Sequence, residues 1–284
     1  GILRMWGDIA IAFLLAFITA FVITPYSIRL AKKVGAVDYP NDRRVNKKPM
    51  PRLGGIAVIA GFLVSAIYLI ITMRIENNID FVTDGLGEKL LGSLIGAIIL
   101  SITCYIDDVK GISPLVKLAG QLVAAIIVVS SGVRIDNFTI PFKENSIMIN
   151  EVISYILTIG WIVGITNAIN LIDGLDGLSS GITLIACISM LIIFSLNESP
   201  LIAIILITAL AGAIVGFLPY NFNPARTFIG DVGSNFMGFA ISIISILGVA
   251  KTYTAIVIIA PIIVLALPIF DTLWAIVRRI VKTK

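Results

Sequence analysis

Two asparagines and two aspartates recur at every third position in the stretch NAINLIDGLDGL, residues 167–178. They are Asn167, Asn170, Asp173 and Asp176. Steps of three keep such side chains close together on a helix or a tight 3₁₀-like turn. Strongly apolar segments lie on both sides of the stretch, and acids inside a membrane are costly unless they are paired or hydrated. We therefore predict a functional site here; the alternative is a polar loop that only bridges two helices.

A pair of adjacent aspartates, Asp107 and Asp108, lies in the segment YIDDVKG. Neighbouring carboxylates repel each other unless a cation lies between them. The pair is thus a candidate general base together with an acid that is paired with a metal ion or a lysine. Lys117 and Gln121, on the next apolar segment, could reach back toward it. The alternative is a solvated pair at a helix end.

Basic residues gather in KKPMPRLGG, residues 47–55, next to prolines and glycines. Lys48 offers a point charge and Arg52 a planar fork, and both suit a phosphate group. The alternative is an ordinary basic anchor for lipid headgroups.

A fourth cluster, NPARTFIGDVGSNFMGF, places Asp231 between glycines and follows it with Ser234 and Asn235. Mg²⁺ prefers oxygen ligands combined with water and substrate phosphates. Asp231 is therefore a candidate metal ligand, and Arg226 could bind anionic charge. The competing interpretation is a turn aspartate that caps the next helix.

The composition indicates the kind of protein that must position these groups. The 284 residues are 58% hydrophobic and 13% charged, with a mean hydropathy of +1.05. Soluble domains are about 25% charged, so a polytopic membrane protein is the natural interpretation. There are two cysteines, both in apolar runs, and no histidine, which excludes a Cys/His zinc site.

Nine segments have the ~17–25 residues that a helix needs to cross a membrane. We therefore expect an all-α protein of about nine transmembrane helices, the last kinked or broken at Pro261 and Pro268. An alternating pattern between the fourth and fifth segments indicates a small outer β-hairpin, with an unstructured loop as the alternative. The expected spans are approximately 9–30, 54–73, 90–106, 114–131, 152–169, 178–196, 201–218, 235–250 and 254–280.

The basic residues divide unevenly between the two sides that this topology creates. Of the 21 lysines and arginines, 15 fall on one side and the remaining six on the other. The side with the excess is cytoplasmic by the positive-inside rule, and the four polar clusters all face it. Together they predict a basic, acid-rich pocket suited to phosphoryl transfer between a nucleotide substrate and a membrane lipid.

Several segments together carry a family resemblance: RRVNKKPMPRLGG, DDVKGISP, NAINLIDGLDGL, FIGDVGS and PIFDTLWAIVRR. In this order, over about residues 24–279, the sequence resembles the polyprenyl-phosphate N-acetylhexosamine-1-phosphate transferases. PMPRLGG, PARTFIGD and PIFDT look most like the bacterial undecaprenyl-phosphate N-acetylglucosamine-1-phosphate transferases. The family pattern continues after IVRR with a histidine-rich loop and further spans. We expect residues 1–284 to form one integral membrane domain that lacks that loop and the last helices.

The resemblance implies an enzyme of the inner (plasma) membrane with a cytoplasmic active site. It would transfer N-acetylglucosamine-1-phosphate from a UDP-sugar to undecaprenyl phosphate and release UMP, the first membrane step of cell-envelope polymer synthesis. The implied cofactor is Mg²⁺, with Mn²⁺ as a substitute. The implied partners are both substrates, the bilayer and a second copy of the chain in a homodimer, with no nucleic acid.

The resemblance also implies roles for individual residues. Asp107 would be the base on the lipid phosphate, with Asp108 its partner. Asp231 would bind the metal, with Asn170 as a second ligand. The remaining residues would contact the substrates: Lys48, Lys117, Asn167, Asp173, Asp176 and Arg226.

Two other classes of protein remain as alternatives. An ion-coupled transporter predicts acids spread through the bilayer midplane and two repeated halves. Here the motif acids gather at one face and no repeat is visible. A non-catalytic family member that binds UDP-sugar or lipid predicts the same pocket without turnover.

Overall fold

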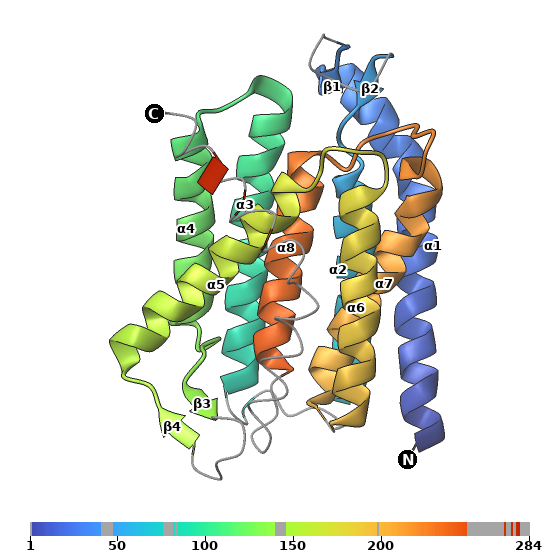
Figure 1. The fold of residues 1–284 in the computed structure, drawn as a ribbon. Coiled ribbons are helices and arrows are strands. Elements are labelled where there is room, and N and C mark those ends of the chain that lie inside the picture. Colours follow the sequence, from blue (N-terminus) through green and yellow to red (C-terminus); the bar gives the residue numbers. More distant parts are fainter. Residues whose placement is uncertain are drawn as a thin grey trace.

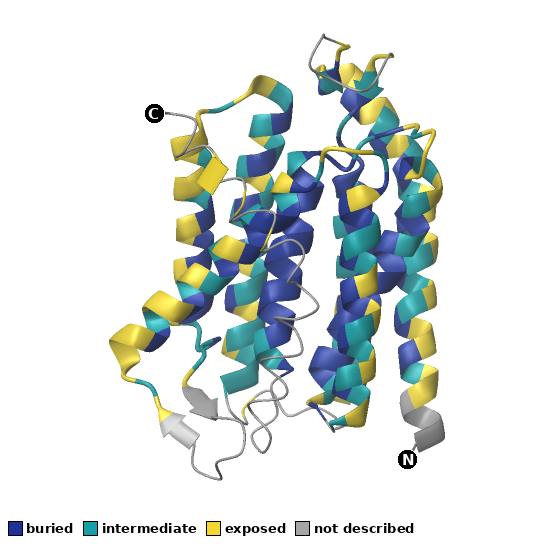
Figure 2. Cartoon of the chain, viewed as in Figure 1, coloured by how far each residue is buried: buried dark blue, intermediate teal, exposed yellow. Residues whose placement is uncertain are grey.

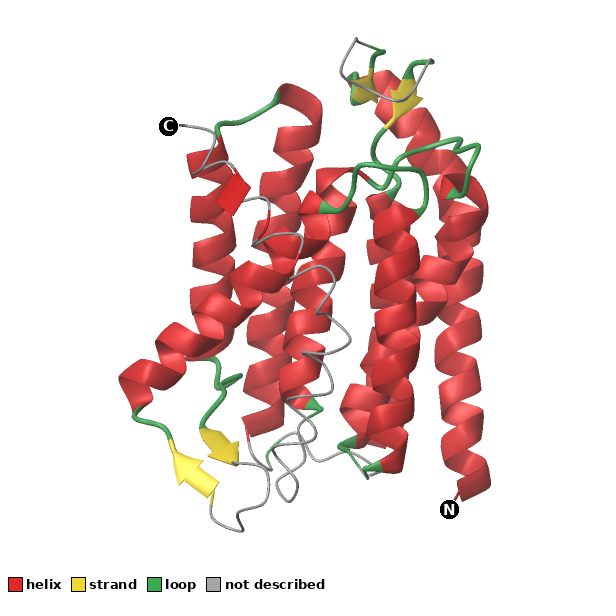
Figure 3. Cartoon of the chain, viewed as in Figure 1, coloured by secondary structure: helices red, strands yellow, loops and turns green. Residues whose placement is uncertain are grey.

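The fold was taken from a computed structural model, which describes residues 2–40, 48–75, 85–139, 146–197 and 199–248 and the single residues 82, 270, 274, 277 and 278. Most of this chain is helical (Figure 3). The helices are α1 Ile2–Val34, α2 Gly55–Ile75, α3 Leu86–Lys110, α4 Pro114–Ser130, α5 Glu151–Leu171, α6 Leu178–Leu196, α7 Leu201–Asn221 and α8 Gly230–Leu247. The strands are β1 Val37–Asp38, β2 Met50–Pro51, β3 Asn137–Thr139 and β4 Ser146–Met148.

Seven of the helices that the structure describes are long and apolar enough to cross a membrane, and α4 is a shorter apolar helix. A helix satisfies its own backbone hydrogen bonds, which is why helices are suited to hydrocarbon. The expected all-α polytopic membrane protein is therefore confirmed. The expected ninth span, 254–280, lies outside the described residues apart from four isolated positions.

The start of α8 differs from the sequence prediction in a way that affects the site. The eighth span was expected to begin at residue 235, but α8 begins at Gly230. Gly230 has φ of +73°, a left-handed conformation that favours glycine, and it turns the chain directly into the helix. The polar, glycine-containing stretch around Asp231 is thus the first turn of a helix rather than a loop.

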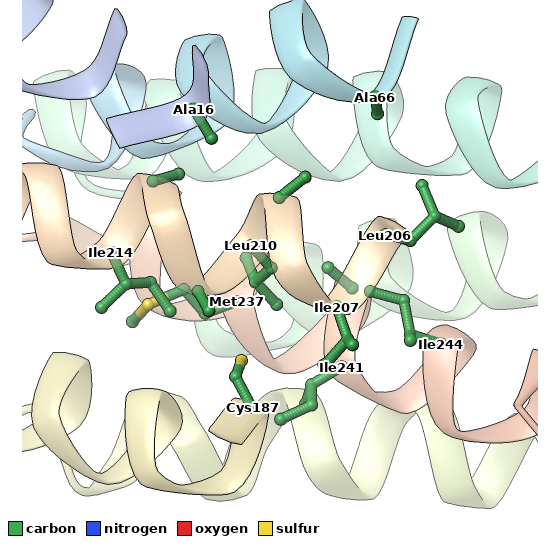
Figure 4. Close-up of a cluster of buried hydrophobic side chains, with 14 of the residues drawn as sticks. Ala16, Ala66, Cys187, Leu206, Ile207, Leu210, Ile214, Met237, Ile241 and Ile244 are labelled. Carbon is green, nitrogen blue, oxygen red and sulfur yellow. The ribbon is translucent and has the colours of Figure 1, made fainter. Parts of the chain in front are cut away.

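Helix α8 lies in the middle of the bundle (Figure 1) and contacts α2, α3, α5, α6 and α7. Its side chains and those of α7 are the most buried of the spans (Figure 2). The largest apolar cluster of the described residues is formed by side chains of α1, α2, α5, α6, α7 and α8 (Figure 4). Among its members are Cys187, Leu206, Ile207, Leu210, Ile214, Met237, Ile241 and Ile244. A central, fully packed α8 gives the residues at its first turn a fixed position.

Small residues allow α1 to approach α7 closely. A side chain at Gly212 would collide with the carbonyl oxygen of Phe13, and one at Gly216 with that of Phe17. Close backbone approach at glycines is typical of helix packing in membranes, where there is no hydrophobic drive between helices.

Two short antiparallel strand pairs lie at opposite ends of the bundle (Figure 1). β1 pairs with β2 beyond the end of α1. β3 pairs with β4 between α4 and α5, in the segment whose sequence alternates, and residues 140–145 between the two strands lie outside the described residues.

The alternation of the helices brings the polar clusters to the same end of the bundle, the upper end in Figure 1. There α3, α5 and α7 end, and α4, α6 and α8 begin. The segment KKPMPRLGG joins them through the backbone, because Phe228 N donates to Pro51 O at 2.8 Å and Gly55 N to Ile229 O at 2.8 Å. Segments far apart in sequence thus form one polar region, called the site end below.

Candidate active site

Asp108 lies at the centre of the polar region and is almost completely buried, with 1% of its side chain exposed. Its carboxylate accepts two backbone hydrogen bonds from the first turn of α8: Asp231 N at 3.0 Å and Val232 N at 2.8 Å. The first N–H groups of a helix have no partner within the helix and favour negative charge. Asp108, at the end of α3, therefore caps α8 from another helix.

Arg52 completes this junction from the segment before α2. Its Nε and Nη2 donate to the carbonyl oxygen of Asp108 at 3.0 Å and 2.8 Å, and Nε lies 3.7 Å from Asp108 Oδ1. A Cβ atom on Gly230 would collide with the carbonyl oxygen of Arg52. The sequence suggested that Arg52 binds phosphate, but in the structure its guanidinium donates to the backbone of Asp108.

The Lys117 ammonium occupies the middle of the site. Its Nζ lies 3.2 Å from Asp107 Oδ2, 3.1 Å from Asp231 Oδ1 and 3.4 Å from Asn170 Oδ1. The three oxygens come from α3, α8 and α5, so four helices converge on one point. A cation between the carboxylates offsets the repulsion that they would otherwise have.

Asn170 and Asp231 are joined directly. Asn170 Nδ2 donates to Asp231 Oδ1 at 2.7 Å and to Ser234 Oγ at 2.8 Å, while its Oδ1 accepts from Lys117. Asp107 Oδ1 accepts from Ile112 N at 3.0 Å, which leaves Oδ2 facing the lysine. The carboxylate of Asp107 therefore has one oxygen directed into the site, whereas both oxygens of Asp108 are used by α8.

Asp173 and Asp176 lie in the turn between α5 and α6, where Gly177 adopts φ of +69°. Asp173 Oδ1 accepts from Ser179 Oγ at 2.7 Å. Burial raises the pKa of Asp173 to about 7, the Ser179 hydrogen bond lowers it, and the charge of Asp231 raises it further. Asp176 instead faces the loop before α8.

The carboxylate of Asp176 holds that loop. Its Oδ2 accepts from Ala225 N at 3.0 Å and from Asn223 Nδ2 at 3.1 Å. Arg226, in the same loop, is exposed, and its backbone N donates to Tyr220 O at 2.8 Å. Lys48 is likewise exposed, in the segment that leads into β2.

Asn167 lies one turn deeper than Asn170, away from the Lys117 centre. Its amide pairs with Gln121 of α4, and Gln121 pairs with Asn235 of α8. The sequence pattern groups Asn167 with the substrate-binding residues, and the structure separates it from them. A step of three along a helix does not keep a side chain at the same depth, which explains the difference.

The donor set fits a hard divalent cation. Among the described residues, no group of three or more His, Cys, Asp or Glu side chains gathers to hold a metal. Mg²⁺, however, commonly uses one or two carboxylates and completes its shell with water and substrate phosphates. Asp231 Oδ1, Asn170 Oδ1 and Asp107 Oδ2 are oxygens of that kind, and all three lie within 3.4 Å of Lys117 Nζ.

Comparison with known proteins identifies the family. The model of glycosyl transferase family 4 matches residues 90–249, which include most of α3, all of α4 to α8 and the aspartates around Lys117. This chain belongs to that family. The resemblance read from the motifs is confirmed, and the chain is an enzyme of the transferase class.

Curated relatives extend the match over nearly the whole chain. A probable undecaprenyl-phosphate N-acetylglucosaminyl 1-phosphate transferase of Bacillus subtilis (strain 168) is 42% identical over 278 residues, 96% of this chain and 72% of the relative. A decaprenyl-phosphate N-acetylglucosaminephosphotransferase of Mycobacterium tuberculosis (strain H37Rv) is 34% identical over 288 residues, covering 93% and 69%.

A third relative carries a different name from the first two. The phospho-N-acetylmuramoyl-pentapeptide-transferase of Staphylococcus epidermidis (strain ATCC 12228) is 33% identical over 247 residues, 84% of this chain and 74% of the relative. The residues around Lys117 in this family 4 member all fall within the matched range 90–249, whereas Arg52 and Lys48 precede it.

Proposed function

We propose that this transferase moves N-acetylglucosamine-1-phosphate from its UDP-sugar to undecaprenyl phosphate and releases UMP. The observation that carries the proposal is the convergence of Asp107, Asn170 and Asp231 on Lys117 at one end of a membrane bundle. The 42% identity to the Bacillus subtilis relative supports the choice of sugar and lipid. The product would begin the synthesis of a cell-envelope polymer.

The chemistry is a displacement at the β-phosphorus of the donor. An oxygen of the lipid phosphate forms a bond to that phosphorus, and the bond to the UMP oxygen breaks, with its electron pair leaving on UMP. Asp107 Oδ2 faces the site and would accept the proton of the lipid phosphate. We favour this direct attack over a covalent enzyme intermediate.

Positive charge and orientation come from the other residues. Lys117 would contact the transferring phosphate, since its ammonium faces the position where the anionic oxygens must lie. Mg²⁺, held by Asp231 and Asn170, would neutralise charge on the diphosphate, and Mn²⁺ would substitute for it. Asp108 would not act on substrate, because α8 uses both of its oxygens.

The substrate pocket would lie beside this centre. Asp173 and Asp176 border it from the α5–α6 turn and would shape the nucleotide and sugar site. Arg226 and Lys48 would add charge for phosphates from its exposed rim. Asn167 does not border this pocket in the proposal, because its amide pairs with Gln121.

We also propose that the chain lies in the plasma membrane with the site toward the cytoplasm, an orientation that the excess of lysine and arginine at the site end supports. It would give the site access to a cytosolic sugar nucleotide. The apolar outer faces of the helices would also allow a homodimer within the bilayer.

The direct test is the lipid product. Purified protein in detergent is incubated with undecaprenyl phosphate, Mg²⁺ and one of several UDP-hexosamines, and the lipid fraction is analysed by mass spectrometry. We expect undecaprenyl-diphosphate N-acetylglucosamine from UDP-N-acetylglucosamine. If only another UDP-hexosamine gave a lipid product, the proposed donor sugar would be wrong. Binding without any product would support the non-catalytic alternative, and neither binding nor product would favour a transporter.

A further inference from the structure

Three helices each carry two site residues that are one turn apart. Lys117 and Gln121 lie on α4, Asn170 and Asn167 on α5, and Asp231 and Asn235 on α8. The first member of each pair belongs to the Lys117 centre. The second members meet one turn deeper, where they form what is called the amide layer below (Gln121, Asn167 and Asn235).

The amide layer is closely hydrogen-bonded. Gln121 Nε2 donates to Asn235 Oδ1 at 2.8 Å and to Asn167 Oδ1 at 3.3 Å, and Asn167 Nδ2 donates back to Gln121 Oε1 at 2.6 Å. Gln121 and Asn235 are buried, with 2% and 0% exposed. The layer joins α4 to α8, although α4 packs mainly on α3 and α5.

Two backbone carbonyls fix the direction of every hydrogen bond in the layer. Asn167 Nδ2 donates to Val163 O at 2.8 Å and Asn235 Nδ2 to Asp231 O at 2.8 Å. Carbonyl oxygens only accept, so both asparagines must turn their nitrogens toward them. Asn235 then presents its oxygen to Gln121, which must present its nitrogen. Only one arrangement of the three amides satisfies all of these contacts.

Neutral amides suit this place better than charged or apolar groups. A carboxylate here would compete for Lys117, and an apolar side chain would leave buried polar atoms without partners. Asn235 bonds to the backbone of Asp231 itself, and Asn167 lies one turn from Asn170 on the same helix. A shift in the layer would therefore move two oxygens of the site above it.

We propose that Gln121, Asn167 and Asn235 are positioning residues that set the distance between Asn170 and Asp231, and thereby the affinity of the site for a divalent cation. The inference rests on the proposed function in taking Asn170 and Asp231 as the metal ligands. It moves Asn167 from the substrate-binding residues to the layer that supports them.

The test is the affinity of the purified full chain for Mn²⁺ in the presence of UDP, measured by electron paramagnetic resonance. Gln121→Met keeps the length of the side chain and removes its hydrogen bonds. We expect it to weaken Mn²⁺ binding by about 10-fold and to raise the Mg²⁺ concentration needed for half-maximal activity by a similar factor. The KM for the UDP-sugar at saturating metal should change less than threefold.

A matched control separates positioning from loss of packing. Val128→Ala lies on the same helix, in the fully buried apolar core, and removes packing without touching the layer. It should lower the Tm at least as much as Gln121→Met and leave Mn²⁺ affinity within twofold. If Gln121→Met does not yield folded protein, Asn167→Leu can replace it, because position 167 is half-buried. It should also weaken Mn²⁺ binding, but by a smaller factor.

The outcomes distinguish the positioning role of the amide layer from the proposed metal ligands. Equal Mn²⁺ affinity in the wild type, Gln121→Met and Asn167→Leu would overturn the positioning role and leave the proposed function intact. An absence of Mn²⁺ binding by the wild-type protein with UDP would overturn the metal ligands, and the positioning role with them.

Discussion

A cation lies between two acidic side chains at each end of the helix bundle, and the two arrangements differ mainly in their exposure. At the site end, Lys117 is 16% exposed and bridges Asp107 (13%) and Asp231 (32%). At the opposite end, Arg134 is 27% exposed and bridges Asp136 (51%) and Glu151 (77%). The sign and number of charges are the same.

Solvent makes the difference between them. Water and salt screen the Arg134 group, which also lies over the ring of Tyr155 at 5.3 Å and holds the loop after α4 to α5. The Lys117 group lies where screening is weaker, so each charge there acts strongly on the others and on any bound phosphate. The same charge pattern therefore stabilises a loop at the Arg134 end, whereas at the Lys117 end it is suited to catalysis.

The largest expected effect is on turnover at the buried cluster. Lys117→Met should lower kcat/KM for UMP formation by about 100-fold or more, because a preorganised positive group facing the phosphates is lost. Arg134→Met, which removes the matching cation at the other end, should leave kcat/KM within threefold. Comparable losses of kcat/KM in both variants would mean that the buried Lys117 group and the exposed Arg134 group do not differ in function.

The two adjacent aspartates should separate into an activity effect and a stability effect. Asp107→Asn should lower turnover by about 100-fold and change the Tm little, because it removes the proposed base. Asp108→Asn should destabilise the protein by about 1–3 kcal/mol, because an amide cannot accept both N–H groups of α8. Thermal unfolding in detergent and UMP assays measure both, and equal destabilisation of the two variants would contradict the capping role.

Glycines in the left-handed conformation provide a stability comparison between the ends. Gly85, before α3 at the end far from the site, has φ of +65° and open space around it, so Gly85→Ala should cost about 1–2 kcal/mol of backbone strain. Gly230→Ala should cost about 2–5 kcal/mol, because its Cβ would also collide with Arg52. Denaturation in detergent micelles measures the difference in unfolding free energy. Equal costs would show that the backbone at Arg52 moves aside easily for a Cβ atom at position 230.

The smallest effect is expected at the exposed ion pair. Glu151→Gln removes the negative charge from the 3.0 Å pair with Arg134 Nη1, and should change the unfolding free energy by less than about 0.5 kcal/mol. Any change should shrink further in high salt. A salt-independent loss well above this size would show that the Arg134 group is shielded more than its exposure indicates.

The sequence predicts the helices well because length and apolar composition decide what can cross a membrane. It fails at the start of α8, where Gly230 and Asp231 have the composition of a loop. Their helical state depends on an acceptor, Asp108, that is 123 residues away. A local pattern contains no signal of such a distant cap.

The grouping of Asp107, Lys117, Asn170 and Asp231 could be predicted from motif order and the side on which each loop lies. The direction of single side chains could not. Arg52 turns toward Asp108 rather than outward, and Asn167 turns toward Gln121, since each is governed by partners on other helices. Amides at neighbouring turns of three apolar helices are the signal that would have revealed the deeper layer.

The central claim is that the oxygens around Lys117 form a metal-dependent transfer site. The most direct measurement is UMP release by purified protein with UDP-N-acetylglucosamine, undecaprenyl phosphate and Mg²⁺, beside an Asp231→Asn variant. We predict release that requires both lipid and Mg²⁺ and falls by at least about 100-fold in the variant. Release that persists in the variant, or that needs no Mg²⁺, would contradict the claim.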